Sequence, residues 1–165
     1  MIDWKIWVTT GMEHILDFYG YDHMLFMTLL ALMYPYNEWK KLLGLITAFT
    51  VGHSLTLALS VTNSIKIQPE LIELLIVLTI AFTAAFQLFY SKNTPNRGKV
   101  IYLIIACFGL IHGIGFSFLL KSMLGHEEAI FIPLLMFNTG LEIGQILFVL
   151  FISVLIVIVL TILIK

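Results

Sequence analysis

Five long apolar segments dominate this sequence, and they restrict it to a small set of folds. They cover about residues 10–34, 41–63, 70–90, 100–122 and 129–163, and the short connections between them carry turn-forming and charged residues. A helix that crosses a bilayer needs about 20 mostly apolar residues, and each segment reaches that length. The pattern therefore predicts an all-α fold, a polytopic transmembrane helix bundle with about five spans.

The composition agrees with a lipid bilayer as the main partner of the chain. Hydrophobic residues make up 60% of the sequence and charged residues 12%, whereas soluble domains carry about 25% charged residues. We expect residues 1–165 to form a single membrane domain. The net charge of -1 offers no basic face for nucleic acid. The lone Cys107 excludes an intrachain disulfide, and the N-terminal MIDWKIWVTT lacks the features of a signal peptide.

The last segment is longer than one crossing requires. Its length of about 35 residues corresponds to a helix of about 50 Å, against a hydrocarbon core of about 30 Å. We therefore expect it either to tilt and protrude or to break near FNTGLEIG, where a break would create a sixth short element.

The distribution of basic residues predicts an orientation in the membrane. Basic residues concentrate on the cytoplasmic side of membrane proteins. This favours an outside N-terminus and a cytoplasmic C-terminus, in a bacterial inner membrane. The residues on the predicted inner side are Lys40, Lys41, Lys92, Arg97, Lys99 and Lys165, and those on the outer side are Lys5, Lys66 and Lys121.

Small residues recur at every fourth position in three of the apolar segments. Such stripes let helix backbones approach closely in lipid. The spacing predicts tight helix packing, either within one chain or between the protomers of a homo-oligomer. The glycines concerned are Gly44, Gly52, Gly109, Gly113, Gly140 and Gly144.

Polar and ionisable side chains gather at four places: EHILDFYGYDH, FTVGHSLT, FGLIHGIGF and FNTGLEIGQ. A charge at the bilayer centre costs at least about 2.5–3.5 kcal/mol on insertion scales, so such groups pair, bind an ion or line a water path. The candidate metal ligands are His14, Asp17, Asp22, His23, His53, His112 and Glu142, and the candidate polar lining is Thr50, Ser54, Thr56, Asn138 and Gln145.

The first of these places sets a geometric condition. On an unbroken helix His14 and His23 would lie on opposite faces, about 13 Å apart along the axis. They can share one ion only if the helix breaks, for which Gly20 is the favoured point. Otherwise they serve two sites, or one of them is structural.

The donor set indicates which ions to expect. Imidazole and carboxylate together suit divalent transition metals such as nickel, cobalt, iron or zinc, whereas magnesium prefers oxygen alone. The sequence contains neither an HExxH motif nor the signature of a nucleophilic triad. The ligand composition therefore predicts a divalent transition metal as cargo or cofactor.

The four motifs together resemble those of the HupE/UreJ family of membrane proteins, over about residues 11–151. The gap between the first two histidines is longer than in the family's usual H-P-x-x-G-x-D-H form. The resemblance implies a nickel or cobalt permease, often linked to hydrogenase, urease or cobalamin supply. It also implies metal entry at the first motif and a site continued by His53, His112 and Glu142. The matching residues are His14, Gly20, Asp22 and His23; His53, Ser54 and Thr56; His112; and Asn138, Glu142 and Gln145.

Three functions fit these residues. In a permease, the first motif captures the ion and passes it to a midplane site formed by His53, His112 and Glu142, and histidine protonation helps release. In an intramembrane metalloenzyme or metal-cofactor protein, the same ligands hold one or two fixed metals and act on a hydrophobic substrate. A structural protein would instead use its small-residue stripes to dock on another membrane protein.

Overall fold

The fold is all-α, as the sequence predicts. The structure is a computed structural model that describes residues 4–18, 20–34, 36–62, 67–89, 99–124 and 130–163. Within these ranges there are helices and no strand. The elements are α1 (Trp4–Leu16), α2 (Tyr21–Met33), the short 3-10 helix η1 (Tyr36–Glu38), α3 (Trp39–Val61), α4 (Pro69–Phe89), α5 (Val100–Leu124) and α6 (Phe131–Leu163).

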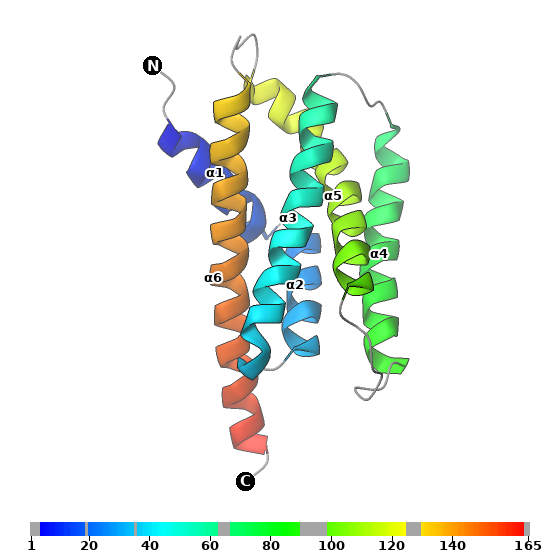
Figure 1. Cartoon of the computed structure of the whole chain (residues 1–165), viewed down its shortest axis with the longest axis vertical. Helices are drawn as coiled ribbons and strands as arrows, with labels where there is room; N and C mark the ends of the chain where they lie inside the picture. The colour runs from blue at the N-terminus through cyan, green and yellow to red at the C-terminus, as the bar shows by residue number, and fades with distance from the viewer. Residues whose placement is uncertain are drawn as a thin grey trace.

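Four helices, α3 to α6, are long and apolar enough to cross a bilayer. They run alternately up and down the bundle, and the two termini lie at its opposite ends (Figure 1). We call these the N-terminal end, where α4 and α6 begin, and the C-terminal end, where α6 finishes. The predicted spans 41–63, 70–90, 100–122 and 129–163 coincide with these helices to within a few residues.

The first predicted span, 10–34, is not one helix but two. Helices α1 and α2 have 13 residues each, and both run toward the C-terminal end, in place of a single crossing (Figure 1). Between them the Gly20 N–H donates to the Asp17 carbonyl oxygen over 3.1 Å. The Gly20 backbone, at φ -104° and ψ 52°, is not helical. The break occurs where the sequence favours it.

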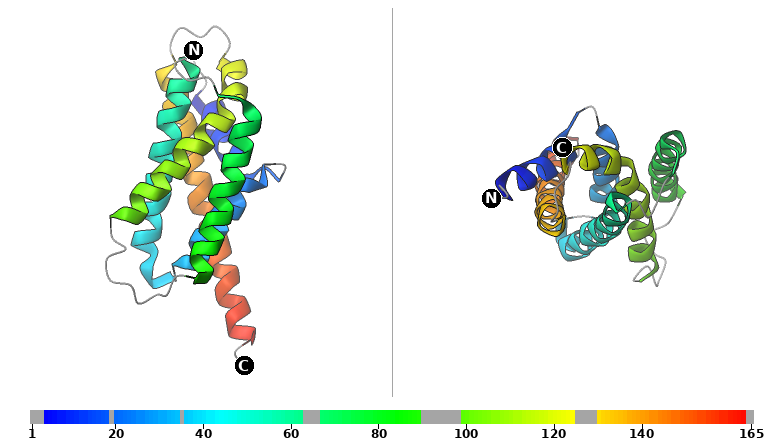
Figure 2. Two further views of the ribbon diagram at one scale, coloured as in Figure 1. Left: turned by 90° about the vertical axis from the view of Figure 1, so that its right-hand side faces the viewer. Right: turned by 90° about the horizontal axis from the view of Figure 1, so that it is seen from above.

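The last apolar segment forms one long helix and does not break near FNTGLEIG. Helix α6 continues for 33 residues through FNTGLEIG, and its C-terminal part extends beyond the other helices (Figures 1 and 2). Its side chains from Val154 to Leu163 are almost all exposed, and apolar. They are suited to contact with lipid.

The glycine stripes pack helices of the same chain against one another. A methyl group on Gly52 would collide with the Ala106 carbonyl oxygen, and one on Gly109 with the Phe49 carbonyl oxygen. Helices α3 and α5 therefore touch backbone to backbone. The side chain of Tyr102, also on α5, covers Gly44. These glycines pack against helices of the same chain, so they give no support to the predicted homo-oligomer, which stays a prediction.

Helices α1 and α6 repeat this interface. A methyl group on Gly11 would collide with the Phe137 carbonyl oxygen, and one on Gly140 with the Val8 carbonyl oxygen. The two interfaces correspond residue by residue: Gly11 matches Gly109, and Gly140 matches Gly52. The two helices of each pair run in the same direction and cross at an angle, and α3 and α5 run opposite to α1 and α6 (Figure 1). The bundle thus contains two similar helix pairs of inverted orientation.

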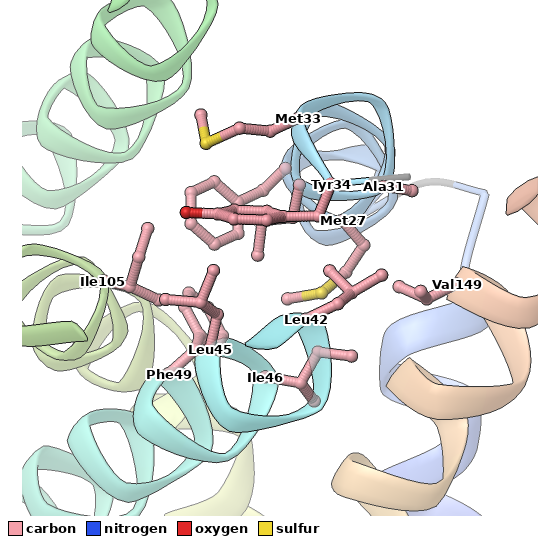
Figure 3. Packing of buried hydrophobic residues seen from close by; sticks show 12 residues of the cluster. Met27, Ala31, Met33, Tyr34, Leu42, Leu45, Ile46, Phe49, Ile105 and Val149 are labelled. Carbon is pink, nitrogen blue, oxygen red and sulfur yellow. The ribbon is translucent and has the colours of Figure 1, made fainter. Parts of the chain in front are cut away.

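An apolar cluster fills the bundle toward the C-terminal end. Figure 3 shows side chains from α2, α3, α5 and α6 meeting there, with Met27, Leu45 and Phe49 among them. Phe49 and Leu45 are fully buried.

Among the basic residues used to predict the orientation, Lys66, Lys92, Arg97 and Lys165 lie outside the described residues, so the orientation stays a prediction.

Candidate metal centre

Four histidines from four helices meet in the middle of the bundle: His14 of α1, His23 of α2, His53 of α3 and His112 of α5. The ring centroids of His23 lie 4.6 Å from His14, 5.9 Å from His53 and 5.1 Å from His112. His23 is thus at the centre of the group. It is there because the break at Gly20 turns the start of α2 back toward the end of α1.

The imidazole nitrogens are buried and largely without partners. His23, His53 and His112 are 3%, 0% and 1% exposed. The atoms without a hydrogen-bond partner are His14 Nε2, His23 Nε2, His53 Nδ1, His53 Nε2 and His112 Nδ1. Buried polar atoms are nearly always hydrogen-bonded, and an unpaired one costs about 1–3 kcal/mol. So many unpaired nitrogens at one point are suited to an ion that accepts their lone pairs.

An acidic residue orients the central histidine. Asp22 Oδ1 lies 3.2 Å from His23 Nδ1 and also accepts the His23 backbone N–H over 2.9 Å. With a proton on Nδ1, His23 donates to Asp22 and directs the lone pair of Nε2 into the group. A carboxylate that fixes a ligating histidine in this way is the usual second partner of protein metal sites.

The side chains form two sets that can each hold a divalent ion. One set is His14, His23 and His53, and the other is Asp22, His23 and His112. Within each set the ligand atoms lie within 4.8 Å of one another. Around an ion with bonds of about 2.0–2.1 Å to nitrogen, ligand atoms are roughly 3–3.5 Å apart. Small side-chain movements would therefore complete either set. Imidazole-rich donors fit zinc, nickel, cobalt and iron.

A cavity of about 570 Å³ reaches the centre from the N-terminal end of the bundle. Pro69 at the start of α4 and Lys121 near the end of α5 line its outer part, and His14, His23 and His112 line it deeper in. Its described lining includes three carboxylates, on Asp17, Asp22 and Glu73, and one ammonium group, on Lys121. A cavity with an excess of carboxylates attracts cations.

Phenylalanines border the histidines on both sides. Toward the C-terminal end, Phe26 and Phe49 are fully buried, with ring centroids 5.1 Å apart. The Phe49 ring lies 5.1 Å from that of His112. Toward the N-terminal end, Phe116 and Phe137 stack on each other, and Phe116 packs 3.9 Å from His14. The inner phenylalanines continue into the apolar cluster, which separates the histidines from the C-terminal end of the bundle among the described residues.

The other residues that the sequence indicated line the cavity or form hydrogen bonds within and between helices. Asp17 is exposed and lines the cavity. Thr50 donates to Gln145 Oε1 over 2.9 Å, and Asn138 Nδ2 donates to the Leu134 carbonyl oxygen. Ser54 and Thr56 bond backbone carbonyl oxygens of their own helix.

Glu142 is not brought to the histidines. It accepts a hydrogen bond of 2.7 Å from Thr47, between α6 and α3, and belongs to neither ligand set. The unbroken α6 explains this. At the turn where α6 crosses α1, Gly140 and Gly144 face α1, and Glu142 lies on a different side of the helix.

We expect the variant Glu142→Gln to bind Ni²⁺ and Co²⁺ as tightly as the wild type does. Its carboxylate accepts a hydrogen bond from the Thr47 hydroxyl, and the amide oxygen of glutamine can accept the same bond. Competition with a chromophoric chelator, on purified protein in detergent, measures this affinity. A lost affinity in Glu142→Gln would restore Glu142 to the ligand set that the motif pattern predicts.

Three features of the centre lie outside the ligand, lining and packing residues that the sequence predicts. Thr79 of α4 lies 3.1 Å from His112 Nε2, Gly11 sets the approach of α1 to α6, and Glu73 lines the cavity. The correspondence between helices does leave a trace in the sequence. GMEH at Gly11–His14 matches GLIH at Gly109–His112, and FTVG at Phe49–Gly52 matches FNTG at Phe137–Gly140. Thr79 has no such signal.

Fold and centre together define a polytopic helical membrane protein with a buried histidine cluster that opens to one end of the bundle. Residues 2–164 match the sequence profile described as HupE / UreJ protein, and the chain belongs to this family. The family suggests a nickel/cobalt transporter-like membrane protein. No curated protein and no solved structure matches the chain.

Proposed function

We propose that this protein is a permease for a divalent transition-metal ion, with nickel and cobalt as the first candidates. The observation that carries the proposal is the group of unpartnered imidazole nitrogens at the inner end of an acidic cavity. The acidic lining concentrates hydrated cations. The histidines then replace part of the hydration shell with neutral nitrogen ligands, which nickel and cobalt accept readily.

The two ligand sets support a transfer of the ion along the bundle. His23 belongs to both sets, so an ion can move between them without losing all its protein ligands. His14, Asp22, His23 and His112 line the cavity, whereas His53 is fully buried and does not line it. In the proposed path the ion enters at the ligands that line the cavity and then gains His53 as a further ligand.

The inverted helix pairs also favour a transporter rather than a protein that holds a fixed metal. In many secondary transporters the substrate site lies near the bilayer midplane, between repeats of inverted topology that move against each other. Here His14 and His112 occupy corresponding positions of the two pairs, each three residues after a packing glycine. Movement of one pair against the other would reposition ligands from both.

A metalloenzyme or metal-cofactor protein is the second candidate, because two ligand sets that share a histidine also suit a centre with two fixed ions. The two functions differ in whether the metal ion leaves its site. A permease transfers the ion across a membrane, and an enzyme keeps it.

We expect liposomes that contain the pure protein to take up Ni²⁺ or Co²⁺ faster than empty liposomes. Uptake of Ni²⁺, Co²⁺, Fe²⁺, Mn²⁺ and Zn²⁺, followed with an enclosed metal-sensitive dye, measures the rate and names the cargo. Flux of none of these ions, from protein that retains tightly bound metal, would contradict the permease and favour the fixed centre. Reversing the imposed ion gradient tests whether the protein works in one direction only.

A further inference from the structure

Helix α4 contributes no ligand to the two sets, yet one of its side chains contacts the centre. Thr79 is 5% exposed, and its Oγ1 lies 3.1 Å from His112 Nε2. The same hydroxyl donates to the Ile76 carbonyl oxygen over 2.7 Å. Thr79 is the described hydrogen-bond partner of the His112 ring, whose other nitrogen, Nδ1, has none.

These contacts fix the tautomer of His112. A threonine hydroxyl has one proton, and here it is used on the Ile76 carbonyl oxygen. Thr79 Oγ1 must therefore accept, and the proton of neutral His112 must be on Nε2. The opposite tautomer would place a proton on Nδ1, where a buried donor would have no acceptor. That arrangement costs about 1–3 kcal/mol.

The consequence is that the lone pair of His112 is on Nδ1. His23 presents the opposite nitrogen, because Asp22 holds its Nδ1 and leaves Nε2. The two neighbouring histidines thus use different nitrogens, each selected by a hydrogen bond on the far side of its ring. Such outer partners fix ring orientation and ligand basicity in protein metal sites.

We propose that Thr79 is a positioning residue for the metal: it holds His112 as the Nε2–H tautomer and so directs Nδ1 to the ion. This role rests on the proposed metal-binding function. It also gives α4 a part in that function, because movement of α4 away from α5 would release the ring of His112.

The test compares Thr79→Val, which replaces the hydroxyl by a methyl group of similar size, with Thr83→Val. Thr83 is a matched control: it is 3% exposed, lies one turn further along α4, and its described hydrogen bond goes to the Thr79 carbonyl oxygen and not to a histidine. We expect Thr79→Val to bind Co²⁺ about 10–100-fold more weakly, the usual effect of losing an outer partner. Thr83→Val should bind like the wild type, and Thr79→Ser should restore binding.

Two readouts separate positioning from a general structural effect. The visible absorption bands of bound Co²⁺ should change in Thr79→Val, because the ligand geometry changes. Thermal unfolding of the metal-free Thr79→Val and Thr83→Val proteins should differ little. Equal losses of affinity in both variants, or wild-type affinity and Co²⁺ bands in Thr79→Val, would overturn the proposal.

A third readout does not depend on metal. Two-bond ¹H–¹⁵N NMR spectra of the imidazoles report which nitrogen carries the proton. The metal-free wild type should show His112 protonated on Nε2, and Thr79→Val should lose this preference. A His112 protonated on Nδ1 in the wild type would overturn the role of Thr79 even if metal binds. A wild type that binds no metal, with the expected tautomer, would instead show that the proposed function has failed, and the positioning role with it.

Discussion

The variant His23→Ala is expected to lose metal flux almost completely. His23 is the shared member of both ligand sets, so its removal leaves two ligands in each. Loss of an outer partner of a metal ligand costs about 10–100-fold in affinity, and loss of the ligand itself should exceed the upper end of that range. We expect Ni²⁺ or Co²⁺ uptake into liposomes to fall at least about 100-fold.

The single variants His53→Ala and His112→Ala give this experiment its control. Each removes a ligand from one set and leaves the other intact, so each should retain more metal binding than His23→Ala does. The double variant should resemble His23→Ala. A graded series of this kind reports two overlapping sites. Equal effects of all three single variants would instead indicate one site with all the histidines, and unchanged flux in His23→Ala would exclude the cluster as the path.

The variant Gly109→Ala is expected to destabilise the bundle strongly. Its new methyl group would overlap the Phe49 carbonyl oxygen and lie 3.0 Å from the His53 backbone nitrogen. Backbone atoms cannot move aside as a side chain can, so α3 and α5 must separate along the interface. Overpacking typically costs about 1–3 kcal/mol and occasionally more. We expect a lowered midpoint of thermal unfolding in detergent, together with weaker metal binding, because α3 carries His53 and α5 carries His112.

Gly115→Ala is the matched control on the same helix. A methyl group there would lie 3.2 Å from Ile76 Cδ1, the end of a flexible side chain that can rotate away. The thermal midpoint of this variant should stay close to that of the wild type. Alanine is the better helix former, so helix propensity alone would stabilise both variants. Equal destabilisation by both substitutions would therefore contradict a special role of the backbone contact between α5 and α3.

Much of the architecture could be predicted because lipid imposes simple rules on a sequence. A bilayer requires helices of known minimum length, so the apolar segments located α3 to α6 within a few residues. The break in the first span was predicted only as a condition on His14 and His23. Gly20 allowed it, but whether the chain breaks depends on what the resulting half-helices can pack against. Here Gly11 packs α1 against α6 and makes the short helix possible.

The metal ligands illustrate a different limit. Each histidine could be recognised because an ionisable group within an apolar segment needs a reason to be there. Glu142 met the same criterion, but the structure pairs it with Thr47 outside the cluster. Thr79 did not meet it, since a threonine that bonds its own helix backbone is ordinary in a membrane helix. Its contact with His112 depends on how α4 packs against α5.

The sequence by itself determined that this protein is a helical membrane protein with imidazole and carboxylate groups inside the bundle. Hydrophobicity and residue chemistry are local properties, and they can be read without knowing which helices are neighbours. Only the tertiary structure decided which groups meet. His14, His53 and His112 surround His23, Asp22 contacts the His23 ring, Thr79 contacts the His112 ring, and Glu142 lies elsewhere. The directions of side chains depend on the crossing and rotation of helices, which backbone contacts at Gly11, Gly52, Gly109 and Gly140 establish.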